Sequence, residues 1–225
     1  MSLNLSKRLS TSFILFLILL TCLFSNKFLW VYLLLTCSFI SFNEFNNLLK
    51  KIYKRKITKI YVFNFLAFIY LFFFINIGLN LYSLSVPGLF FVLLICIFSD
   101  TGGYIIGKSF GGRKLTKISP NKTISGSIGS FIFSLIPILF FLYFDQSINF
   151  IYKNFNIISL MLVCVFLSLI CQLGDLFFSY LKRKAKVKDT GSILPGHGGL
   201  LDRIDGFIFV LPFAFLLNKL FLVLW

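Results

Sequence analysis

Acidic residues are scarce in this chain, and histidine is almost absent. Only 7 of the 225 residues are Asp or Glu, against 22 Lys and Arg, and His197 is the single histidine. A lone histidine is more often structural or exposed than catalytic, so we do not expect His197 to act as a general base. The 5 cysteines lie in apolar segments without CxxC spacing. This pattern argues against disulfides and zinc sites and favours small buried side chains.

The sequence also lacks the polarity that a large soluble domain requires. Hydrophobic residues make up 58% of the chain, 32 residues are phenylalanine, and the mean hydropathy is +0.94. A soluble domain averages less than half apolar residues. We therefore predict an all-α, polytopic membrane bundle of about seven spans, without internal repeats or low-complexity linkers. The expected spans are residues 11–25, 28–42, 61–77, 87–106, 125–144 (with a kink at Pro137), 157–181 and 204–224.

The excess of positive charge does not indicate nucleic-acid binding, because its distribution has a simpler explanation. Of the 22 basic residues, 19 fall in four clusters, at residues 7–8, 50–59, 108–122 and 182–203. If the N-terminus is cytoplasmic, seven alternating spans place all four clusters inside, as the positive-inside rule requires. We interpret residues 43–59 as a basic interfacial segment, in which Glu44, its only acid, pairs with a nearby lysine.

One polar stretch, from Gln172 to Asp205, interrupts the apolar pattern. It holds four of the seven acids together with basic residues and glycines. Charges near a bilayer are costly unless they are paired, metal-bound or hydrated. Carboxylates can hold a divalent metal, cations can hold phosphate, and glycines let backbone amides approach a ligand. The stretch therefore predicts a site that combines metal, phosphate and membrane. Its acids are Asp175, Asp189, Asp202 and Asp205.

The spacing within this stretch resembles the signature of phosphatidate cytidylyltransferases, also called CDP-diacylglycerol synthases. The matching positions are Ser179, Lys182-Arg183, Lys188-Asp189, Gly191, Pro195-Gly196-His197-Gly198-Gly199, Asp202-Arg203 and Asp205. Two further segments resemble motifs of the same family, Ser99-Asp100-Thr101-Gly102-Gly103-Tyr104 and Ser119-Pro120-Asn121-Lys122-Thr123. Gly103 replaces the usual alanine, and Ser125 replaces the usual glutamate. The motifs cover roughly the C-terminal half of the chain, and their many fixed gaps make the match specific.

The resemblance implies a reaction of CTP with phosphatidic acid that yields CDP-diacylglycerol and pyrophosphate. It implies Mg²⁺ held by Asp175, Asp202 and Asp205, with Lys182 and Arg183 acting in catalysis, and it leaves a second, monovalent cation and a homodimer open. The implied substrate contacts are Ser179, Lys188, Asp189, His197, Gly198, Gly199, Arg203, Asp100, Ser119, Lys122 and Thr123. Residues 1–60 would form an N-terminal hairpin with the basic segment, and residues 61–225 a catalytic domain in a bacterial inner membrane.

Several alternatives stay open from the residues alone. Asp202 and Asp205 share a helix face and open the last span, so N-capping competes with metal binding. A CTP-dependent polyprenol or phytol kinase would have a related architecture, and a transporter would spread its charges through several spans. The segment from Gly102 to Ser109 matches the Walker A pattern. Its glycines end an apolar run and no helix start follows, so we predict that it is not a phosphate-binding loop.

Overall fold

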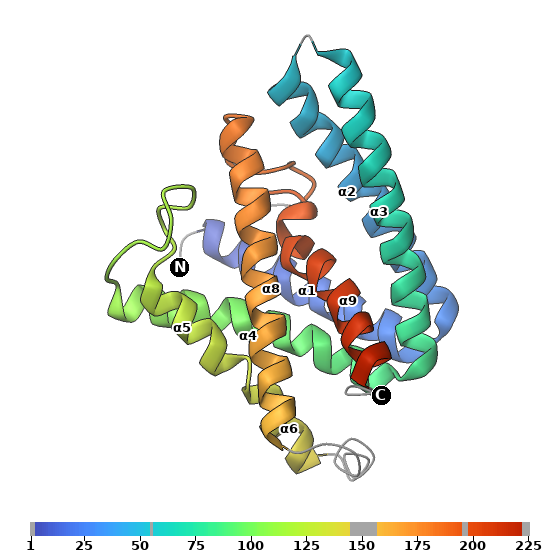
Figure 1. Ribbon diagram of the computed structural model, residues 1–225, viewed down its shortest axis with the longest axis vertical. Coiled ribbons are helices and arrows are strands. Elements are labelled where there is room, and N and C mark those ends of the chain that lie inside the picture. Colours follow the sequence, from blue (N-terminus) through green and yellow to red (C-terminus); the bar gives the residue numbers. More distant parts are fainter. Residues whose placement is uncertain (1–2, 55, 145–156, 195–197, 222–225) are drawn as a thin grey trace. The chain divides into compact units, whose positions relative to one another are not determined.

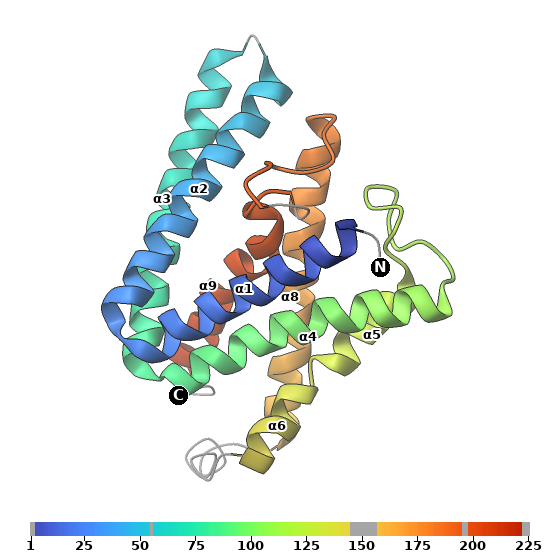
Figure 2. The same cartoon turned by 180° about the vertical axis from the view of Figure 1, so that it is seen from behind.

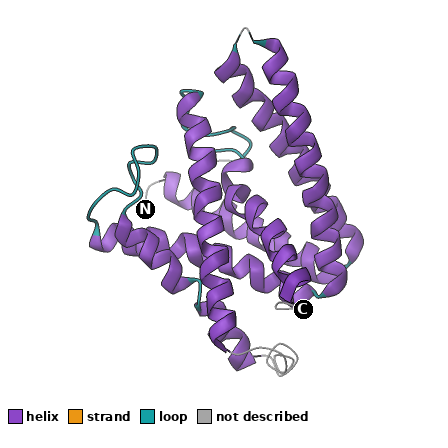
Figure 3. Cartoon of the chain, viewed as in Figure 1, coloured by secondary structure: helices purple, strands orange, loops and turns teal. Residues whose placement is uncertain are grey.

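The structure is a computed structural model that describes residues 3–54, 56–144, 157–194 and 198–221. Over these residues the chain is helical, with loops between the helices and only isolated β-bridges (Figure 3). The chain divides into two compact units. Unit 1 comprises Met1–Val86 and Tyr180–Ile204, and unit 2 comprises Pro87–Ser179 and Asp205–Trp225. The predicted all-α class is confirmed, and the domain boundary predicted at residue 60 stays a prediction.

Unit 1 contains a long helical hairpin. Helix α1 (Leu3–Ser25) is followed by α2 (Lys27–Tyr53) and α3 (Ile57–Leu84), and α2 and α3 lie side by side in both views (Figures 1 and 2). Asn26 caps α2 by accepting a hydrogen bond from the Leu29 amide at 2.9 Å. Buried Trp30 donates its indole N–H to the Gly78 carbonyl of α3 at 3.1 Å. Aromatic packing and this bond fix the register of the hairpin.

Helix α2 is longer than the sequence predicted, which corrects the interpretation of residues 43–59 as a separate interfacial segment. The helix continues to Tyr53, and the chain turns at Lys54, whose φ is +29°. Leu48 and Leu49 are 1% and 2% exposed. Their burial stabilises the helix through this polar sequence, because packing of an apolar face contributes more to helix stability than local propensity does.

Unit 2 is built on an apolar core contributed by several helices. It holds α4 (Val86–Phe110), α5 (Ile124–Phe133), α6 (Ile136–Phe144), and most of α8 (Ile157–Lys184) and α9 (Leu201–Phe221). Cys164, Leu167 and Val210 are fully buried in this core. The Ser99 and Ser168 hydroxyls pair at 2.8 Å inside it, which satisfies two polar groups that would be costly to bury alone. Cys96, Cys164 and Cys171 are buried, as predicted, whereas Cys22 and Cys37 are only partly buried.

A break interrupts the span that the sequence predicted over residues 125–144. Helix α5 ends at Phe133 and α6 begins at Ile136, immediately before Pro137. Proline has no amide hydrogen and disfavours helical geometry in the residue before it, so the interruption falls at the position expected. The predicted kink is confirmed, and it separates the helix that carries the site from the one that follows.

Four helices are long and apolar enough to cross a membrane within the described part of the chain. They are α2, α3, α4 and α8, and Ser10–Ser25 and Ile124–Phe140 are shorter apolar segments. Helix α3 exposes large apolar side chains such as Phe65, Phe68 and Phe72. A row of exposed aromatics on a helix is expected where lipid, and not water, surrounds it. The protein is therefore a helical membrane protein, while the total of about seven spans stays a prediction.

Candidate functional site

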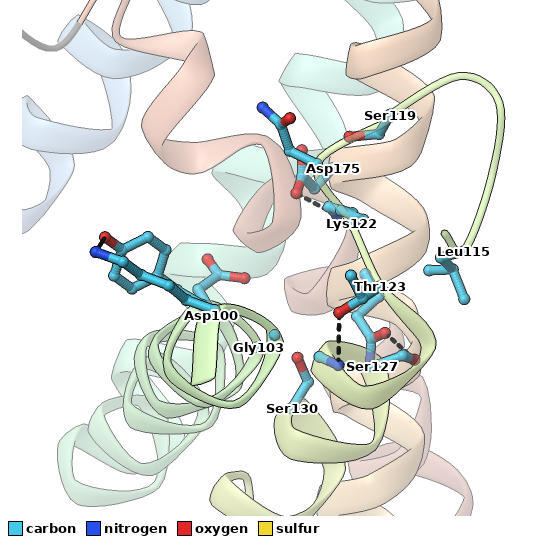
Figure 4. Close-up of a pocket in the computed structure, with 15 residues that line it drawn as sticks. Asp100, Gly103, Leu115, Ser119, Lys122, Thr123, Ser127, Ser130 and Asp175 are labelled. Atoms are coloured by element: carbon cyan, nitrogen blue, oxygen red, sulfur yellow. Dashed lines mark hydrogen bonds and ion pairs between the residues drawn. The ribbon is translucent and has the colours of Figure 1, made fainter. Parts of the chain in front are cut away.

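A polar pocket of about 630 Å³ lies within unit 2 and collects residues from both motif regions. Its wall is formed by α4, the loop before α5, the first turns of α5, and α8 (Figure 4). The lining residues are Asp100, Gly103, Tyr104, Gly107, Lys108, Leu115, Ser119, Asn121, Lys122, Thr123, Gly126, Ser127, Ser130, Gln172 and Asp175. Five of the substrate or metal residues predicted from the sequence therefore share this pocket, namely Asp100, Ser119, Lys122, Thr123 and Asp175.

The centre of the pocket is an ion pair between segments that are far apart in the sequence. The Lys122 ammonium contacts the Asp175 carboxylate, and the side chains are 27% and 29% exposed. Ser179, one turn further along α8, donates to the other Asp175 oxygen at 3.3 Å. Ser127 on α5 donates to the Gln172 side-chain oxygen at 2.5 Å. The polar end of α8 is thus joined to the start of α5 inside one unit.

The loop before α5 is held in place by its own polar residues. Thr123 caps α5 by accepting from the Gly126 amide at 3.1 Å. Backbone bonds pair Leu115 with Lys122 at 2.8 Å and Arg113 with Ile124 at 3.0 Å. Ser125, which stands where the family glutamate is usual, donates its hydroxyl to the Gly111 carbonyl. The loop therefore presents Lys122 from a closed turn, and Ser125 serves to close it.

The glycines of the Walker A lookalike have a packing role. Gly102 and Gly107 lie inside α4, so this segment is helix and forms no phosphate-binding loop. A β-carbon on Gly103 would lie 2.5 Å from the Ser130 hydroxyl, and one on Gly126 would lie 2.8 Å from the Gly103 carbonyl. Helices α4 and α5 therefore cross at a distance that only glycine permits. The sequence-based rejection of a P-loop is confirmed.

Close packing also brings α9 against α8 within unit 2. A β-carbon on Gly174 would lie 2.8 Å from the Asp205 carbonyl oxygen, and one on Gly206 would lie 2.5 Å from the Cys171 sulfur. The Cys171 thiol donates to the Asp100 carboxylate at 3.7 Å. Asp205 is itself buried, and its carboxylate accepts from the Gly206 amide at 2.8 Å. Asp175 and Asp205 thus occupy neighbouring turns of two helices in contact.

Unit 1 contains the other part of the predicted site, a loop organised around Asp202. Lys182 donates to Asp202 Oδ1 at 2.7 Å, with side chains 15% and 6% exposed. Asp202 Oδ2 accepts from the Thr190 amide at 2.8 Å, the Thr190 hydroxyl at 3.0 Å and the Gly199 amide at 3.1 Å. Asp202 lies within α9 and does not cap it. Its Oδ1 is engaged by Lys182 of α8, and its Oδ2 by the loop that joins α8 to α9.

The charge state of Asp202 follows from these contacts. Burial alone would raise the pKa of this carboxyl, because the charged form loses hydration. The Lys182 ammonium and the Thr190 and Gly199 amides outweigh burial, and they hold the pKa of Asp202 below its usual range. The carboxylate is therefore ionised at neutral pH, which suits an acceptor of four hydrogen bonds.

A second cavity, of about 730 Å³, lies within unit 1 where this loop faces the end of α2. Lysines 50, 51 and 54 line one wall, and the loop lines the other. The residues are Asn47, Lys50, Lys51, Lys54, Asp189, Thr190, Gly191 and Ser192. Gly198, whose φ is +85°, packs closely against Asp189, since a β-carbon there would lie 2.9 Å from the Asp189 β-carbon. The cavity is positively charged and accessible.

The remaining predicted residues are distributed as follows. Arg183, Lys188 and Arg203 are exposed, and His197 lies outside the described residues. Asp202 belongs to unit 1, whereas Asp175 and Asp205 belong to unit 2. Over the described residues, no three His, Cys, Asp or Glu side chains already form a metal-binding group.

Sequence reasoning missed two residues with polar roles, Gln172 and Glu44. Gln172 is 8% exposed and lines the unit 2 pocket. Glu44 does not pair with a lysine, so that prediction was wrong. It accepts from the Thr190 hydroxyl and from the amides of Leu200 and Leu201. The available signal was its isolation, because one acid in a mostly apolar helix needs partners.

The architecture defines a helical membrane protein with two polar pockets, each lined by lysine and aspartate side chains. Comparison with known proteins gives the family. The profile of the cytidylyltransferase family matches residues 51–221, and this chain belongs to that family. The match extends from α3 to α9. It therefore includes every residue that lines the unit 2 pocket and the loop residues that line the unit 1 cavity.

Curated relatives agree with the family profile. Phosphatidate cytidylyltransferase of Bacillus subtilis (strain 168) is 43% identical over 161 residues, which cover 69% of this chain and 57% of the relative. The Staphylococcus haemolyticus protein of the same name is 48% identical over 144 residues, covering 62% and 53%. The Staphylococcus aureus (strain COL) protein is 50% identical over 135 residues, covering 58% and 50%. The chain spans about half the length of these relatives.

Proposed function

We propose that this protein transfers the cytidylyl group of CTP to phosphatidic acid, giving CDP-diacylglycerol and pyrophosphate. One observation carries the proposal. Two segments that resemble family motifs, residues 99–104 and 119–123, line one pocket, where Lys122 contacts Asp175 of the polar stretch from Gln172 to Asp205. The names of the relatives in Bacillus and Staphylococcus support the same substrates. A pocket of about 630 Å³ is large enough for a nucleotide.

The reaction requires positioning of charge more than a strong base. An oxygen of the lipid phosphate attacks the α-phosphorus of CTP, a new P–O bond forms, and the bond to the β-phosphate bridge breaks to release pyrophosphate. The nucleophile is already an anion, so no proton must be removed from it. Two polyanions must instead be held in line. Lys122 would contact phosphate oxygens in the unit 2 pocket, where Ser119 and Thr123 add hydroxyl groups.

The side chains of unit 2 fit a magnesium ion. Mg²⁺ prefers oxygen ligands and is usually bound through one or two carboxylates plus substrate phosphates, so a ready group of three acids is unnecessary. Asp175 lines the pocket, and Asp205 lies on the neighbouring turn of α9. When bound, the ion would neutralise charge on the phosphates. We assign Asp175 and Asp205 to the metal and Asp202 first to the loop, since its oxygens already accept four hydrogen bonds.

The membrane setting follows from the same chemistry. Phosphatidic acid resides in the bilayer and CTP in the cytoplasm, so we propose an inner-membrane protein with its N-terminus and its basic clusters on the cytoplasmic side. Lys50, Lys51 and Lys54 line the unit 1 cavity. Lysine side chains that lie at the membrane surface favour the binding of anionic lipid head groups.

Purified protein in lipid nanodiscs, supplied with CTP and Mg²⁺, tests the proposal. Pyrophosphate should be released only when phosphatidic acid is present, and labelled CTP should yield a CDP-lipid. Release of CDP in the presence of a polyprenol would indicate the kinase instead. Absence of either product, together with uptake of a solute into proteoliposomes, would indicate a transporter.

A further inference from the structure

Glu44 is a buried carboxylate in α2 whose partners all come from the loop between α8 and α9. The side chain is 3% exposed. Its Oε2 accepts from the Thr190 hydroxyl at 2.8 Å and from the Leu201 amide at 2.9 Å, and its Oε1 accepts from the Leu200 amide at 3.0 Å. These residues all belong to unit 1. The carboxylate therefore has strong, charge-assisted partners that compensate for its burial.

The loop is shaped around this carboxylate. A β-carbon on Gly191 would collide with Glu44 Oε1, and one on Gly199 would collide with Glu44 Oε2. The two glycines thus leave the space that the Glu44 head group fills. Side chains at either position would push the loop away from α2. Gly191 leaves room for Glu44, and Gly199 leaves room for both the Thr190 hydroxyl and Glu44, a residue about 150 positions earlier in the chain.

Glu44 also supplies the cap at the start of α9. The first amides of a helix have no partners within it, and the Leu200 and Leu201 amides lie at this end. A carboxylate at a helix N-terminus is favoured by both the free amides and the helix dipole. The capping role that the sequence left open for Asp202 is therefore taken by Glu44 of α2.

A continuous series of contacts leads from Glu44 to the predicted catalytic residues. The Thr190 hydroxyl is 2.8 Å from Glu44 and 3.0 Å from Asp202, and its single hydrogen serves both carboxylates. Asp202 in turn accepts from Lys182 at 2.7 Å. Among the described residues, no bond joins Glu44 directly to Lys182, so any effect of Glu44 on Lys182 passes through Thr190 and Asp202.

We propose that Glu44 is a positioning residue for cytidylyl transfer, which fixes Thr190, Gly191 and residues 199–201 against α2 and thereby sets Lys182 and Asp202. The proposal rests on the function proposed above. It also explains the unit 1 cavity, because Glu44 lies on the same helix as Lys50, Lys51 and Lys54. Anchoring Thr190 and Gly191 to this helix holds the loop wall of the cavity at a constant distance from the lysine wall. A preorganised wall of this kind lowers the cost of ordering a ligand.

The test compares Glu44→Ala and Glu44→Gln with Asn43→Ala, a control at the adjacent exposed position of α2. Hydrogen exchange of the Leu200 and Leu201 amides measures the anchor without reference to activity. In Glu44→Ala these amides should exchange about 10- to 100-fold faster. The value of kcat should fall by about 10- to 100-fold as well, as it does when residues that orient catalytic side chains are replaced. Glu44→Gln keeps one acceptor oxygen and should recover part of both effects. Asn43→Ala should resemble the wild type.

Double variants separate positioning from general destabilisation. Thr190→Val removes the hydroxyl that joins Glu44 to Asp202, so combining it with Glu44→Gln should lower kcat by less than the product of the single effects. Multiplicative effects would overturn the proposal. If Glu44→Ala fails to insert into the membrane, Glu44→Gln, Thr190→Val and their combination test the proposal without it.

Two other outcomes would also count against the proposal. Unchanged exchange of Leu200 and Leu201 in the Glu44 variants would overturn the anchor. Faster exchange with unchanged kcat would show an anchor without a role in catalysis. If the wild type forms no CDP-lipid even though the Leu200 and Leu201 amides exchange faster in the Glu44 variants, that result would refute the proposed reaction, and with it the positioning role of Glu44 in that reaction. It would leave only the structural anchor.

Discussion

Replacing Asp202 by asparagine should loosen the loop between α8 and α9 without unfolding the protein. Asparagine has the same shape but no charge, and its amide nitrogen is a donor. The carboxylate now faces the Lys182 ammonium on one oxygen, and Thr190 and Gly199 donors on the other. The asparagine must therefore turn a donor toward donors on one of these sides. At least one buried contact becomes repulsive.

The magnitude follows from the burial of the pair. The Lys182 and Asp202 side chains are 15% and 6% exposed, so solvent screens them little. Removing one partner of a buried ion pair costs about 3–5 kcal/mol. Because the asparagine oxygen still accepts from some loop donors, we expect the low end, about 3 kcal/mol. That change corresponds to a roughly 100-fold shift in the opening equilibrium of the loop.

Hydrogen exchange followed by mass spectrometry, on protein in nanodiscs at neutral pH, measures this opening. The Thr190 and Gly199 amides, which donate to Asp202, should exchange roughly 100-fold faster in Asp202→Asn. Lys182→Met should loosen the same amides, whereas Lys184→Met, two residues along α8 at an exposed position, should not. Unchanged exchange in Asp202→Asn, combined with an altered Mg²⁺ dependence of activity, would refute this reasoning and restore Asp202 as a primary metal ligand.

The remaining predictions concern helix packing, the Walker A lookalike and topology. Gly129→Val should destabilise unit 2 by about 1–3 kcal/mol, because a β-carbon at Gly129 would lie 2.5 Å from the Ile106 β-carbon. A thermal unfolding scan should show a lower midpoint for this variant. Lys108→Ala should leave appreciable activity, and complete loss of nucleotide binding in a folded variant would contradict the helical assignment. In a cysteine-free background, cysteines at positions 54, 114 and 186 should all react with an impermeant reagent from the cytoplasmic side; labelling of 114 and 186 from opposite sides would contradict the topology.

Local features of the sequence predicted those parts of the structure that depend on neighbouring residues. Pro137 interrupts its helix because of its own ring, and the glycines from 102 to 107 join α4 because an apolar run precedes them. Each of these features lies within a few residues of its cause, so a single sequence suffices to find it.

Features that depend on distant partners could not be found in this way. Helix α2 continues through residues 43–53 because Leu48 and Leu49 are buried by other parts of the chain. Glu44 finds its partners 146 to 157 positions away, and nothing in its immediate sequence identifies them. The motif resemblance placed Asp202 among the metal ligands, which stays a prediction, and its hydrogen bonds to Thr190 and Gly199 add a role in the loop. Motif spacing identifies which residues belong to the site. Only the contacts in the structure show whether such a residue also holds the loop in place.

Formation of CDP-lipid by Asp175→Asn tests most directly the claim that the unit 2 pocket performs the transfer. Wild-type protein in nanodiscs with phosphatidic acid, labelled CTP and Mg²⁺ should form the product, and Asp145→Asn, a control outside the described residues, should match it. Asp175→Asn should insert and fold normally yet form product at least about 100-fold more slowly at every Mg²⁺ concentration, because one lost charge interaction in a transition state costs about 3 kcal/mol. Near-normal turnover of Asp175→Asn, with an unchanged response to Mg²⁺, would contradict the account.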